Sequence, residues 1–508
     1  LSMKEKKLTI ARDRIGEKPL YYGFSGNSFV FSSQLSSFLH YPKFSRELNK
    51  EAIALYLTHN YIPSPYSIYK GICKLEPAKY IEVTLNNDEC ELSEPKSYWE
   101  LKDFSNPENK DNRYLDPNKA LSELDESISD SVLIQSKADV PVGAFLSGGI
   151  DSTLVAAKMQ SLSQEKVNTF TIGFNDKKYN EAIFAKDIAK YLGTEHTELY
   201  IGESELLDIV PNLSNIYDEP FADSSQIPTV IVGQLARKKV TVSLSGDGGD
   251  ELFCGYSRYF KTQERWNKLN KVPKLIRNMA SSISNELPAS FSSKRLFALS
   301  RNMNKDLQRS IDYLGCSDFR HFYRRNISSM LKPEQLVNSA RGAETKYSDL
   351  QIAGISNLEH MMYTDTKQYL PDDILVKVDR AFMSSSLEGR IPLLDHRIVE
   401  FSWKVPISTH CYDGKGKYLL RRLLEKHVPV KYTNRSKMGF GVPLAEWLRG
   451  PLLDWCEDLL SEERLLSDNV FDHSFVREIW SQHKLGQSDW SSLLWSILMF
   501  NMWYELQK

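Results

Sequence analysis

The chain has 508 residues, of which 41% are hydrophobic, a composition typical of a large soluble globular protein rather than of a disordered or fibrous one. Its 64 Lys and Arg residues nearly balance its 66 Asp and Glu residues, which leaves a formal net charge of −2. Such a balance gives no global attraction to nucleic acid or to an anionic membrane, so we expect neither as a partner.

The sequence predicts a cytoplasmic protein without a membrane span. No apolar run approaches the roughly 18 residues that a membrane-spanning helix needs. The most apolar stretch, Leu493–Trp503, is interrupted by Ser496 and Asn501, and its apolar residues occur on all sides of a helix, which favours a buried helix. The six cysteines are scattered without a CxxC pair, so we expect reduced thiols rather than a disulfide framework or a zinc site.

Residues 1–105 predict an antiparallel β-sheet. They contain short apolar or alternating runs, and turn-forming dipeptides such as Gly26-Asn27 separate these runs. Asn, Asp, Pro and Lys then dominate residues 106–118, which we interpret as a linker between two domains.

The second predicted domain, residues 119–508, begins with an alternation of strands and helices. Buried-strand patterns cover residues 140–146, 167–174, 196–201 and 240–245, and helical patterns cover residues 117–136, 181–193 and 228–239, with further helical runs from near 151 and at 203–213. This order predicts an α/β fold with a doubly wound parallel sheet, in which ligands bind beyond the carboxyl ends of the strands. Residues 257–508 predict a mostly helical C-terminal region.

A candidate phosphate-binding loop follows the predicted strand at 140–146. The sequence continues as Leu146-Ser147-Gly148-Gly149-Ile150-Asp151-Ser152 into a helix. Two glycines let backbone N–H groups turn inward, two serines add hydroxyl donors, and the helix begins with its positive end, so the loop suits a phosphate. Asp151 adds a carboxylate of the kind that a phosphate-bound Mg²⁺ takes. The alternative is a plain strand-to-helix turn.

A second loop, Ser245-Gly246-Asp247-Gly248-Gly249-Asp250-Glu251, follows the predicted strand at 240–245. Because the carboxyl ends of parallel strands meet at one edge of a sheet, we expect Asp250 to lie near Asp151. Two carboxylates can share one Mg²⁺ held by a pyrophosphate, whose negative charge offsets their repulsion. The alternative is an acidic glycine-rich turn on a solvated surface. Neither a Walker A motif nor a GxGxxG fingerprint occurs, which weakens a nicotinamide or flavin alternative.

These loops and several further motifs occur in the order typical of glutamine-dependent asparagine synthetases. The further motifs are 218–225, 370–380, 387–395, 416–421 and 435–443. The resemblance implies an ATP pyrophosphatase (PP-loop) domain of the adenine nucleotide α-hydrolase type over residues 119–508. Residues 12–22 and 31–33 resemble the last third of the family's N-terminal-nucleophile glutaminase domain, so the antiparallel sheet of residues 1–105 is expected to be its C-terminal part.

The family's glutaminase nucleophile is an N-terminal cysteine, whereas this sequence starts with Leu1 and its first cysteine is Cys73. We therefore expect the nucleophile and the glutamine-binding residues to lie outside this sequence, either because it is part of a longer protein or because they are absent. Cys73 has neither a free α-amine nor a base beside it in the sequence, so we assign it no catalysis.

The resemblance also implies a role for each site residue. The residues expected to bind ATP are Leu146, Ser147, Gly148, Gly149, Asp151, Ser152, Ile172, Gly173, Ser245 and Gly246. Those expected to bind Mg²⁺ are Asp151 and Asp250, and those expected to take part in catalysis are Lys437 and Asp247. Lys437 is expected to neutralise developing phosphate charge. Asp247 stands where asparagine-forming relatives often carry Glu and is expected to contribute to acceptor binding or proton handling.

Two arginines near these motifs have two possible roles. Arg380 and Arg390 could each bind a substrate carboxylate. They could instead pair with Asp379 and Glu388 in a structural network, the interpretation that we favour.

The resemblance implies an ATP-dependent amide-forming ligase that works with Mg²⁺. A substrate carboxylate attacks the α-phosphorus of ATP, and ammonia derived from glutamine then converts the acyl adenylate to an amide and AMP. The expected acceptor is aspartate; because Asp247 is shorter than the usual Glu, a sugar acid of surface polysaccharide biosynthesis is an alternative, as is a non-catalytic remnant. A homodimer is compatible with the sequence, which does not determine the oligomeric state.

Overall fold

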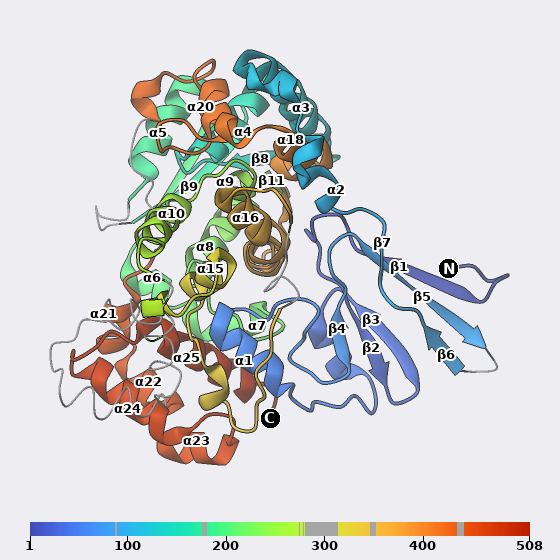
Figure 1. The fold of residues 1–508 in the computed structure, drawn as a ribbon, viewed down its shortest axis with the longest axis vertical. Coiled ribbons are helices and arrows are strands. Elements are labelled where there is room, and N and C mark those ends of the chain that lie inside the picture. The colour runs from blue at the N-terminus through green and yellow to red at the C-terminus, as the bar shows by residue number, and fades with distance from the viewer. Residues whose placement is uncertain are drawn as a thin grey trace.

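The computed structural model describes residues 1–86, 89–174, 180–273, 275–277, 279, 313–345, 352–433 and 441–508. These residues form one five-stranded sheet and two smaller antiparallel sheets, surrounded and joined by helices. Figure 1 shows the antiparallel sheets on one flank of the molecule, the five-stranded sheet in its upper part, and the last helices of the chain at its lower end.

The five-stranded sheet carries the predicted strands. Its members are β8 (Val142–Phe145), β9 (Asn168–Phe174), β10 (Glu195–Ile201), β11 (Val242–Leu244) and β12 (Glu388–Arg390). The spatial order is β10-β9-β8-β11-β12, and every neighbouring pair is parallel. The chain moves outward from β8 to β10 and then returns to the other side of β8, so the strand order reverses between β8 and β11. In open α/β sheets, ligands bind at such a reversal.

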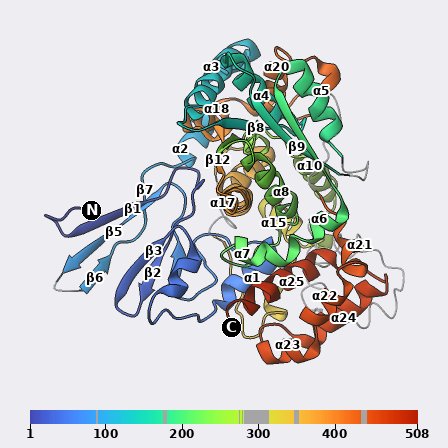
Figure 2. The ribbon, with the colours of Figure 1, turned by 180° about the vertical axis from the view of Figure 1, so that it is seen from behind.

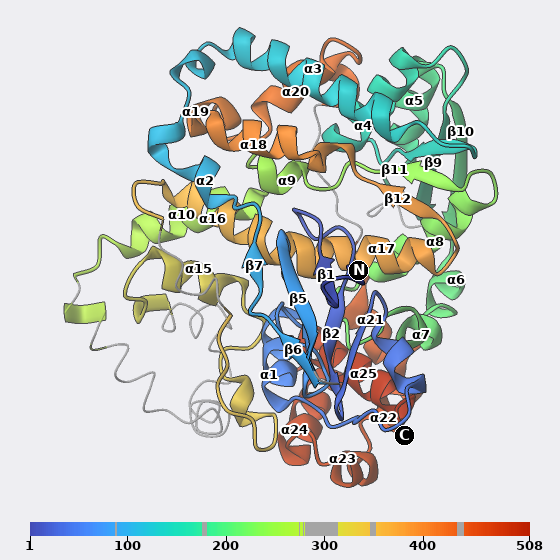
Figure 3. The same cartoon turned by 90° about the vertical axis from the view of Figure 1, so that its right-hand side faces the viewer.

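Helices lie on both sides of this sheet, which confirms the predicted α/β fold with a parallel sheet. They include α3 (Pro117–Gln135), α4 (Ile150–Leu162), α5 (Ala182–Leu192), α8 (Gln226–Arg237), α17 (Leu375–Met383) and α20 (Tyr418–Leu424). In Figure 3, α3, α4 and α5 lie on one side of the strands, and α8 and α17 lie on the other. Local signals set the helix ends: the Asp116 side chain caps α3, and Gly193 ends α5 in a left-handed conformation.

The predicted helical run at 203–213 is divided in the structure. It comprises α6 (Glu203–Leu207), the 3-10 turn η4 (Val210–Asn212) and the start of α7 (Leu213–Ile216). The division falls around Pro211, as the sequence indicates, because proline cannot donate the backbone hydrogen bond that a continuous helix needs there.

The first part of the chain contains the predicted antiparallel strands. One sheet joins β1 (Lys7–Ala11), β5 (Lys79–Asn86), β6 (Glu89–Leu92) and β7 (Lys96–Ser97), and the other joins β3 (Ser28–Ser32), β2 (Tyr21–Ser25) and β4 (Ile72–Lys74). Ser25 pairs with Ser28, so Gly26-Asn27 forms a two-residue hairpin turn, with Gly26 at φ +59. Helix α1 (Lys50–His59), which is buried over its central residues 52–57, and the 3-10 helix η1 (Leu35–His40) are additions that the strand pattern does not predict.

Residues 102–115 hold helical turns that pack on the rest of the chain. These turns are α2 (Lys102–Ser105), η2 (Pro107–Asn109) and η3 (Asn112–Leu115). The Asp111 amide donates to the Lys404 carbonyl at 3.0 Å, and Lys110 Nζ donates to the Trp403 carbonyl at 2.8 Å. Both acceptors lie at the end of α18 (His396–Lys404), so this segment is anchored at several points.

The C-terminal region is mostly helical, with β12 as an exception to that prediction. The first helices after the sheet strand β11 are α9 (Gly249–Leu252) and α10 (Ser257–Leu269). The helices that follow, besides those already named, are α15 (Phe319–Ile327), α16 (Asn357–Thr364), the π-helix η6 (Asp365–Ile374), α19 (Ile407–His410), α21 (Leu444–Arg449), α22 (Leu453–Leu459), α23 (Glu462–Asp468), α24 (His473–Lys484) and α25 (Ser491–Glu505). Three 3-10 turns lie among them: η5 (Pro333–Gln335), η7 (Pro392–Leu394) and η8 (Val430–Tyr432). Within the described ranges, none of the helices is long and apolar enough to cross a membrane.

Helix α25 is buried on all sides, as predicted, and it packs against helix α1 from the first part of the chain. Figure 2 shows α1 beside α25 at the lower end of the molecule. The Tyr56 hydroxyl of α1 donates to the Ser496 carbonyl of α25 at 2.7 Å. One apolar core therefore includes side chains from both ends of the sequence.

Candidate functional site

Two glycine-rich loops meet where the order of the parallel strands reverses. One follows β8 and the other follows β11, and these strands are neighbours. A Cβ at Gly246 would lie 2.5 Å from the Ser152 nitrogen, and a Cβ at Gly249 would lie 2.6 Å from Asp151 Oδ1. Only glycine at these two positions allows the loop after β11 to come this close to Ser152 and to the Asp151 carboxylate. The structure thus brings together the two loops that the sequence predicts as one site.

The loop after β8 is held by its two serines. The Ser147 amide donates to Ser152 Oγ at 3.2 Å, the two hydroxyls are 2.9 Å apart, and the Gly149 amide donates to Ser147 Oγ at 3.2 Å. Gly148 adopts φ +74, which favours glycine, and α4 starts directly afterwards with Asp151 in its first turn. Leu146 is buried, and its amide donates to the Phe170 carbonyl at 2.9 Å, which fixes the loop to β9.

The loop after β11 has its own internal support. Ser245 Oγ donates to Asp247 Oδ2 at 2.8 Å, and Gly248 adopts φ +83 before the short helix α9. The Gly255 amide donates to the Asp250 carbonyl at 2.8 Å, which closes the turn behind that residue. Asp247 remains partly exposed at the edge of the sheet, beside the loop after β8.

Lys417 connects the two carboxylates that the sequence predicts as metal ligands. Its Nζ forms an ion pair with Asp151 and lies 2.8 Å from Asp250 Oδ1, while only 6% of its side chain is exposed. The Lys417 amide donates to the Phe253 carbonyl at 2.8 Å, which places the residue at the start of α20. Burial opposes the charge on Lys417, yet the two carboxylates outweigh this effect and raise the pKa of its ammonium group.

Sequence reasoning missed Lys417. The motif that contains it resembles the family, but the cationic role was assigned to Lys437, which lies outside the described residues. The available signal was weak, because a lysine directly before a helix is common on protein surfaces.

The residues present fit a magnesium ion that is bound together with phosphates. Among the residues that the structure describes, there is no group of three or more His, Cys, Asp or Glu side chains that could hold a metal. Asp151 and Asp250 nevertheless converge on one point, the Nζ of Lys417. Protein sites for Mg²⁺ usually provide one or two carboxylates and leave the remaining positions to water and substrate phosphates. Two convergent carboxylates match that pattern rather than an all-protein cage.

Ile172 and Gly173 lie near the carboxyl end of β9, beside β8. Ile172 is buried in the apolar core. A Cβ at Gly173 would lie 2.8 Å from the Tyr200 ring and 2.9 Å from the Ala182 side chain, so this glycine permits close packing within the domain. The two residues lie at the edge of the sheet where we expect the nucleotide. The contacts just described, however, explain the identity of both residues without a ligand.

Arg380 and Arg390 both form ion pairs within the protein, in agreement with the structural role that we favour from the sequence. Arg390 Nε lies 2.7 Å from Glu388 Oε1. Arg380 pairs with Asp218 at 2.6 Å rather than with Asp379, whose carboxylate accepts from Lys18 Nζ at 2.7 Å. The first part of the chain therefore contacts the helix that follows the π-helix η6.

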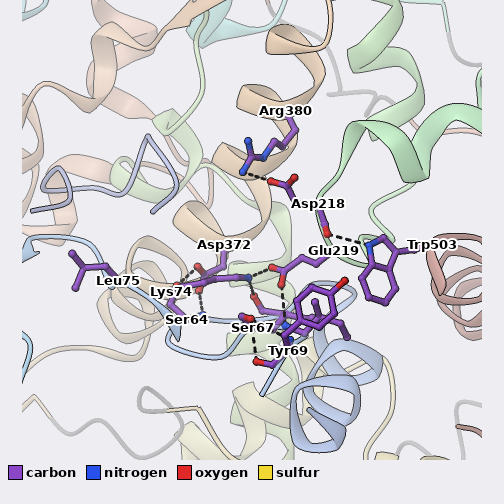
Figure 4. A network of polar contacts seen from close by, with 12 residues as sticks. Ser64, Ser67, Tyr69, Lys74, Leu75, Asp218, Glu219, Asp372, Arg380 and Trp503 are labelled. Carbon is purple, nitrogen blue, oxygen red and sulfur yellow. Dashed lines mark hydrogen bonds and ion pairs between the residues drawn. The ribbon is translucent and has the colours of Figure 1, made fainter. Parts of the chain in front are cut away.

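A buried polar network joins β4 and the loop before it to the second part of the chain (Figure 4). Lys74 forms an ion pair with Glu219, and both side chains are about nine-tenths buried. Asp372 accepts from the Ser64 amide at 2.8 Å and from the Ser64 hydroxyl at 2.7 Å. Trp503 Nε1 donates to the Asp218 carbonyl at 3.0 Å. Charged groups thus fix the contact between residues far apart in the sequence.

The fold and the paired loops define a nucleotide-binding α/β protein with an attached antiparallel β part. The asparagine synthase family model matches residues 123–505, and the glutamine amidotransferase domain model matches residues 1–99. The chain belongs to the asparagine synthase family.

Curated relatives agree with this assignment over nearly the whole chain. Asparagine synthetase (glutamine-hydrolyzing) 1 of Bacillus subtilis (strain 168) is 29% identical over 496 residues, which cover 98% of this chain and 75% of the relative. A protein of Mycobacterium tuberculosis (strain ATCC 25618 / H37Rv), provisionally named as a glutamine-hydrolyzing asparagine synthetase, is 30% identical over 505 residues, covering 99% of this chain and 74% of the relative.

Proposed function

We propose that the chain is an ATP-dependent ligase that amidates the side-chain carboxylate of aspartate with nitrogen from glutamine, giving asparagine, AMP and pyrophosphate. The observation that carries this proposal is the meeting of two glycine-rich loops at the reversal of the strand order, with Asp151 and Asp250 on either side of Lys417. Family membership and the names of the relatives support the same activity.

The first step would activate the acceptor. The aspartate carboxylate attacks the α-phosphorus of ATP, the bond to the pyrophosphate oxygen breaks, and an acyl adenylate forms. Ser147, Gly148, Gly149 and Ser152 would bind the pyrophosphate part, because their backbone amides and hydroxyls lie at the start of α4. Ile172, Gly173, Ser245 and Gly246 would border the rest of the nucleotide.

Charge compensation would come from Lys417, Lys437 and a bound Mg²⁺. Asp151 and Asp250 would hold the metal, which would supply positive charge that offsets the charge of the phosphates. Lys417 Nζ lies between the same two carboxylates. Lys437 would neutralise charge on the phosphates.

The second step would convert the adenylate to the amide. Ammonia attacks the activated carbonyl, and AMP leaves with the electrons of the broken carbon–oxygen bond. Asp247 would assist acceptor binding or proton transfer, since it lies at the meeting point of the two loops.

We propose the domain division that the sequence predicts. Residues 1–105 would be the C-terminal part of an N-terminal-nucleophile glutaminase domain, residues 106–118 a linker, and residues 119–508 a PP-loop ATP pyrophosphatase domain. The antiparallel sheets of the first part and the parallel strand order β10-β9-β8-β11-β12 of the second part support this division. A cytoplasmic enzyme and a homodimer remain predictions.

The test is a product assay on the purified chain. ATP, Mg²⁺ and ammonium are supplied with aspartate or with each of a panel of sugar acids, and nucleotide and amide products are identified by mass spectrometry. We expect AMP and asparagine with aspartate, and neither product from Asp151→Asn. Formation of ADP would reject adenylation, and AMP that forms only with a sugar acid would reject aspartate as the acceptor.

A further inference from the structure

Two cysteines from distant parts of the sequence meet beside the paired loops. Cys254 lies just after the short helix α9, and Cys411 directly follows α19. All six cysteines of the chain are free thiols, and these two are hydrogen-bonded to each other. The preceding side chains also pack together, since the ring centroids of Phe253 and His410 are 5.7 Å apart. The two thiols are therefore placed to react with each other.

Cys254 has a strained backbone. Its φ is +56°, in the left-handed region that favours glycine and that residues with a Cβ seldom adopt. Residues in such conformations persist where the surrounding structure holds them, and they cluster at functional sites and switches. The presence of a cysteine rather than a glycine at this position points to a role for its sulfur.

The hydrogen bond makes Cys411 the more reactive of the two thiols. The contact with Cys254 lowers the pKa of the Cys411 thiol and outweighs burial, which acts in the opposite direction. The same contact, together with burial, raises the pKa of Cys254. Cys411 is also partly exposed, whereas Cys254 is buried. Because thiolates rather than thiols react with oxidants, a peroxide is expected to react first at Cys411, with Cys254 beside it as the resolving thiol.

Cys254 lies against both halves of the candidate nucleotide site. Directly after it, the Gly255 amide donates to the Asp250 carbonyl at 2.8 Å. On its other side, a Cβ at Gly416 would collide with the Cys254 carbonyl, so the backbone just before Lys417 is in direct contact with this residue. Since packed interiors transmit displacements, a movement of Cys254 would reach both Asp250 and Lys417.

We propose that Cys254 and Cys411 are a peroxide-sensitive modification site, at which a reversible disulfide forms and suppresses the activity of the adjacent nucleotide site. The Cys411 thiolate attacks one peroxide oxygen, the O–O bond breaks, and hydroxide leaves, so a sulfenic acid forms. The Cys254 sulfur then attacks the Cys411 sulfur, the S–O bond breaks, and the released hydroxide takes the Cys254 proton. In total, two thiols are oxidised and one hydrogen peroxide is reduced to two water molecules.

The disulfide would change the geometry of the site. A covalent S–S bond is shorter than a hydrogen-bonded contact between two thiols, so one of the two segments must move toward the other. Either movement shifts Asp250 relative to Lys417, and the carboxylates would no longer converge as they do in the reduced protein. A dithiol reductant would restore the reduced arrangement by thiol–disulfide exchange.

The first test detects the disulfide without any assay of activity, so it is independent of the proposed function. The purified chain is reduced with dithiothreitol, desalted, treated with a small excess of hydrogen peroxide, and digested without a reductant. Mass spectrometry is expected to find one peptide pair joined through Cys254 and Cys411. The pair should be absent from Cys411→Ser, and it should disappear from wild type after dithiothreitol.

The second test measures the effect on the nucleotide site. Aspartate-dependent exchange of pyrophosphate into ATP is assayed before peroxide, after peroxide, and after subsequent dithiothreitol. We expect exchange in wild type to fall about tenfold or more after peroxide, because small displacements of catalytic groups have effects on this scale, and to return with dithiothreitol. Cys411→Ser should keep exchange within about twofold of wild type and should not respond to peroxide.

Cys90→Ser is the matched control, because Cys90 is also a partly exposed thiol but lies on β6 in an antiparallel sheet. It should respond to peroxide as wild type does. Cys254→Gly is a second variant in case Cys411→Ser does not fold, since glycine adopts the left-handed backbone without strain. It should also lose the response to peroxide.

Several outcomes would overturn the inference. Absence of the peptide pair from oxidised wild type would do so, as would equal inactivation of wild type and Cys411→Ser by peroxide. Full exchange activity of protein that contains the disulfide would reject its effect on the site. If wild type itself lacks aspartate-dependent exchange, the proposed function fails. The inference is then decided by the peptide pair and by calorimetry with ATP and Mg²⁺, in which equal affinities of the reduced and oxidised protein would reject it.

Discussion

Gly246 lies so close to Ser152 that a Cβ at position 246 would be 2.5 Å from the Ser152 nitrogen. The loop after β11 therefore touches the loop after β8 backbone to backbone at Gly246, and Gly249 lies against the side-chain carboxylate of Asp151. The candidate nucleotide site depends on this approach, because each loop provides part of the donors and one of the two carboxylates.

Gly246→Ala should separate the two loops. The added methyl group would meet backbone atoms that cannot rotate away, and overpacking of this kind typically costs about 1–3 kcal/mol. We expect a lower melting temperature and a strong loss of aspartate-dependent pyrophosphate exchange. Gly342→Ala is the control, since a Cβ there meets nothing within 4 Å. Equal exchange activity in the two variants would contradict the close approach.

Lys417→Met should impair adenylation. The substitution keeps the length of the side chain but removes the charge between Asp151 and Asp250, so the carboxylates lose their shared partner. We expect exchange to fall by about 10²-fold, the usual scale for loss of one preorganised electrostatic group. Lys415→Met, on the exposed segment two residues earlier, should keep wild-type exchange. Full activity of Lys417→Met would remove this lysine from the site.

The ion pair between Lys74 and Glu219 should matter for stability. Both side chains are about nine-tenths buried, and removing one partner of a buried pair typically costs about 3–5 kcal/mol. We expect Lys74→Met to lower the free energy of urea unfolding by this amount, and a second change, Glu219→Gln, to restore part of the loss. Lys70→Met, which breaks a solvent-exposed pair with Glu47, should leave the free energy of unfolding close to that of wild type, because water and salt screen such pairs. Equal effects of the two lysine substitutions would contradict this account.

Acid should destabilise the protein through buried His410. Its Nε2 lies 2.8 Å from the Ser402 carbonyl oxygen, and burial lowers its pKa to about 4, against 6.5 in an unfolded chain. Between these values the unfolded chain binds a proton that the folded protein does not. The free energy of unfolding should therefore fall as the pH drops from 6.5 to 4, by about 3 kcal/mol for this group.

His410→Gln is expected to flatten that dependence, because an amide can donate to Ser402 without titrating. Melting temperatures measured between pH 4 and pH 7 provide the check. His396→Gln, at a side chain that is 43% exposed, should retain the wild-type slope. A slope that is unchanged in His410→Gln would show that other groups control the acid response.

The paired loops could be predicted from the sequence because their signals are local. Each glycine-rich segment directly follows a short apolar strand, and the chain order of strands and helices places both at one edge of a parallel sheet. Lys417 could not be predicted in this way, since its partner Asp151 is 266 residues away in the sequence. Strand β12 has only three residues, too few for a periodic pattern.

Helix α1, in the first part of the chain, could not be predicted from local sequence for the same reason. Its burial comes from side chains at the other end of the sequence, such as the contact of Tyr56 with Ser496. The contact between Cys254 and Cys411 is likewise a property of packing and not of any motif. Local composition predicts where a loop or strand begins, whereas the partner of a buried polar group follows only from the assembled fold.

The most direct test of the central claim follows oxygen rather than nitrogen. Aspartate labelled with ¹⁸O in its side-chain carboxylate is incubated with the purified chain, ATP, Mg²⁺ and ammonium, and the AMP formed is analysed by mass spectrometry. If the carboxylate attacks the α-phosphorus, one labelled oxygen must leave with AMP when ammonia displaces it. We predict AMP that carries one ¹⁸O per asparagine formed. Asparagine accompanied by unlabelled AMP, or by labelled inorganic phosphate and ADP, would contradict the account.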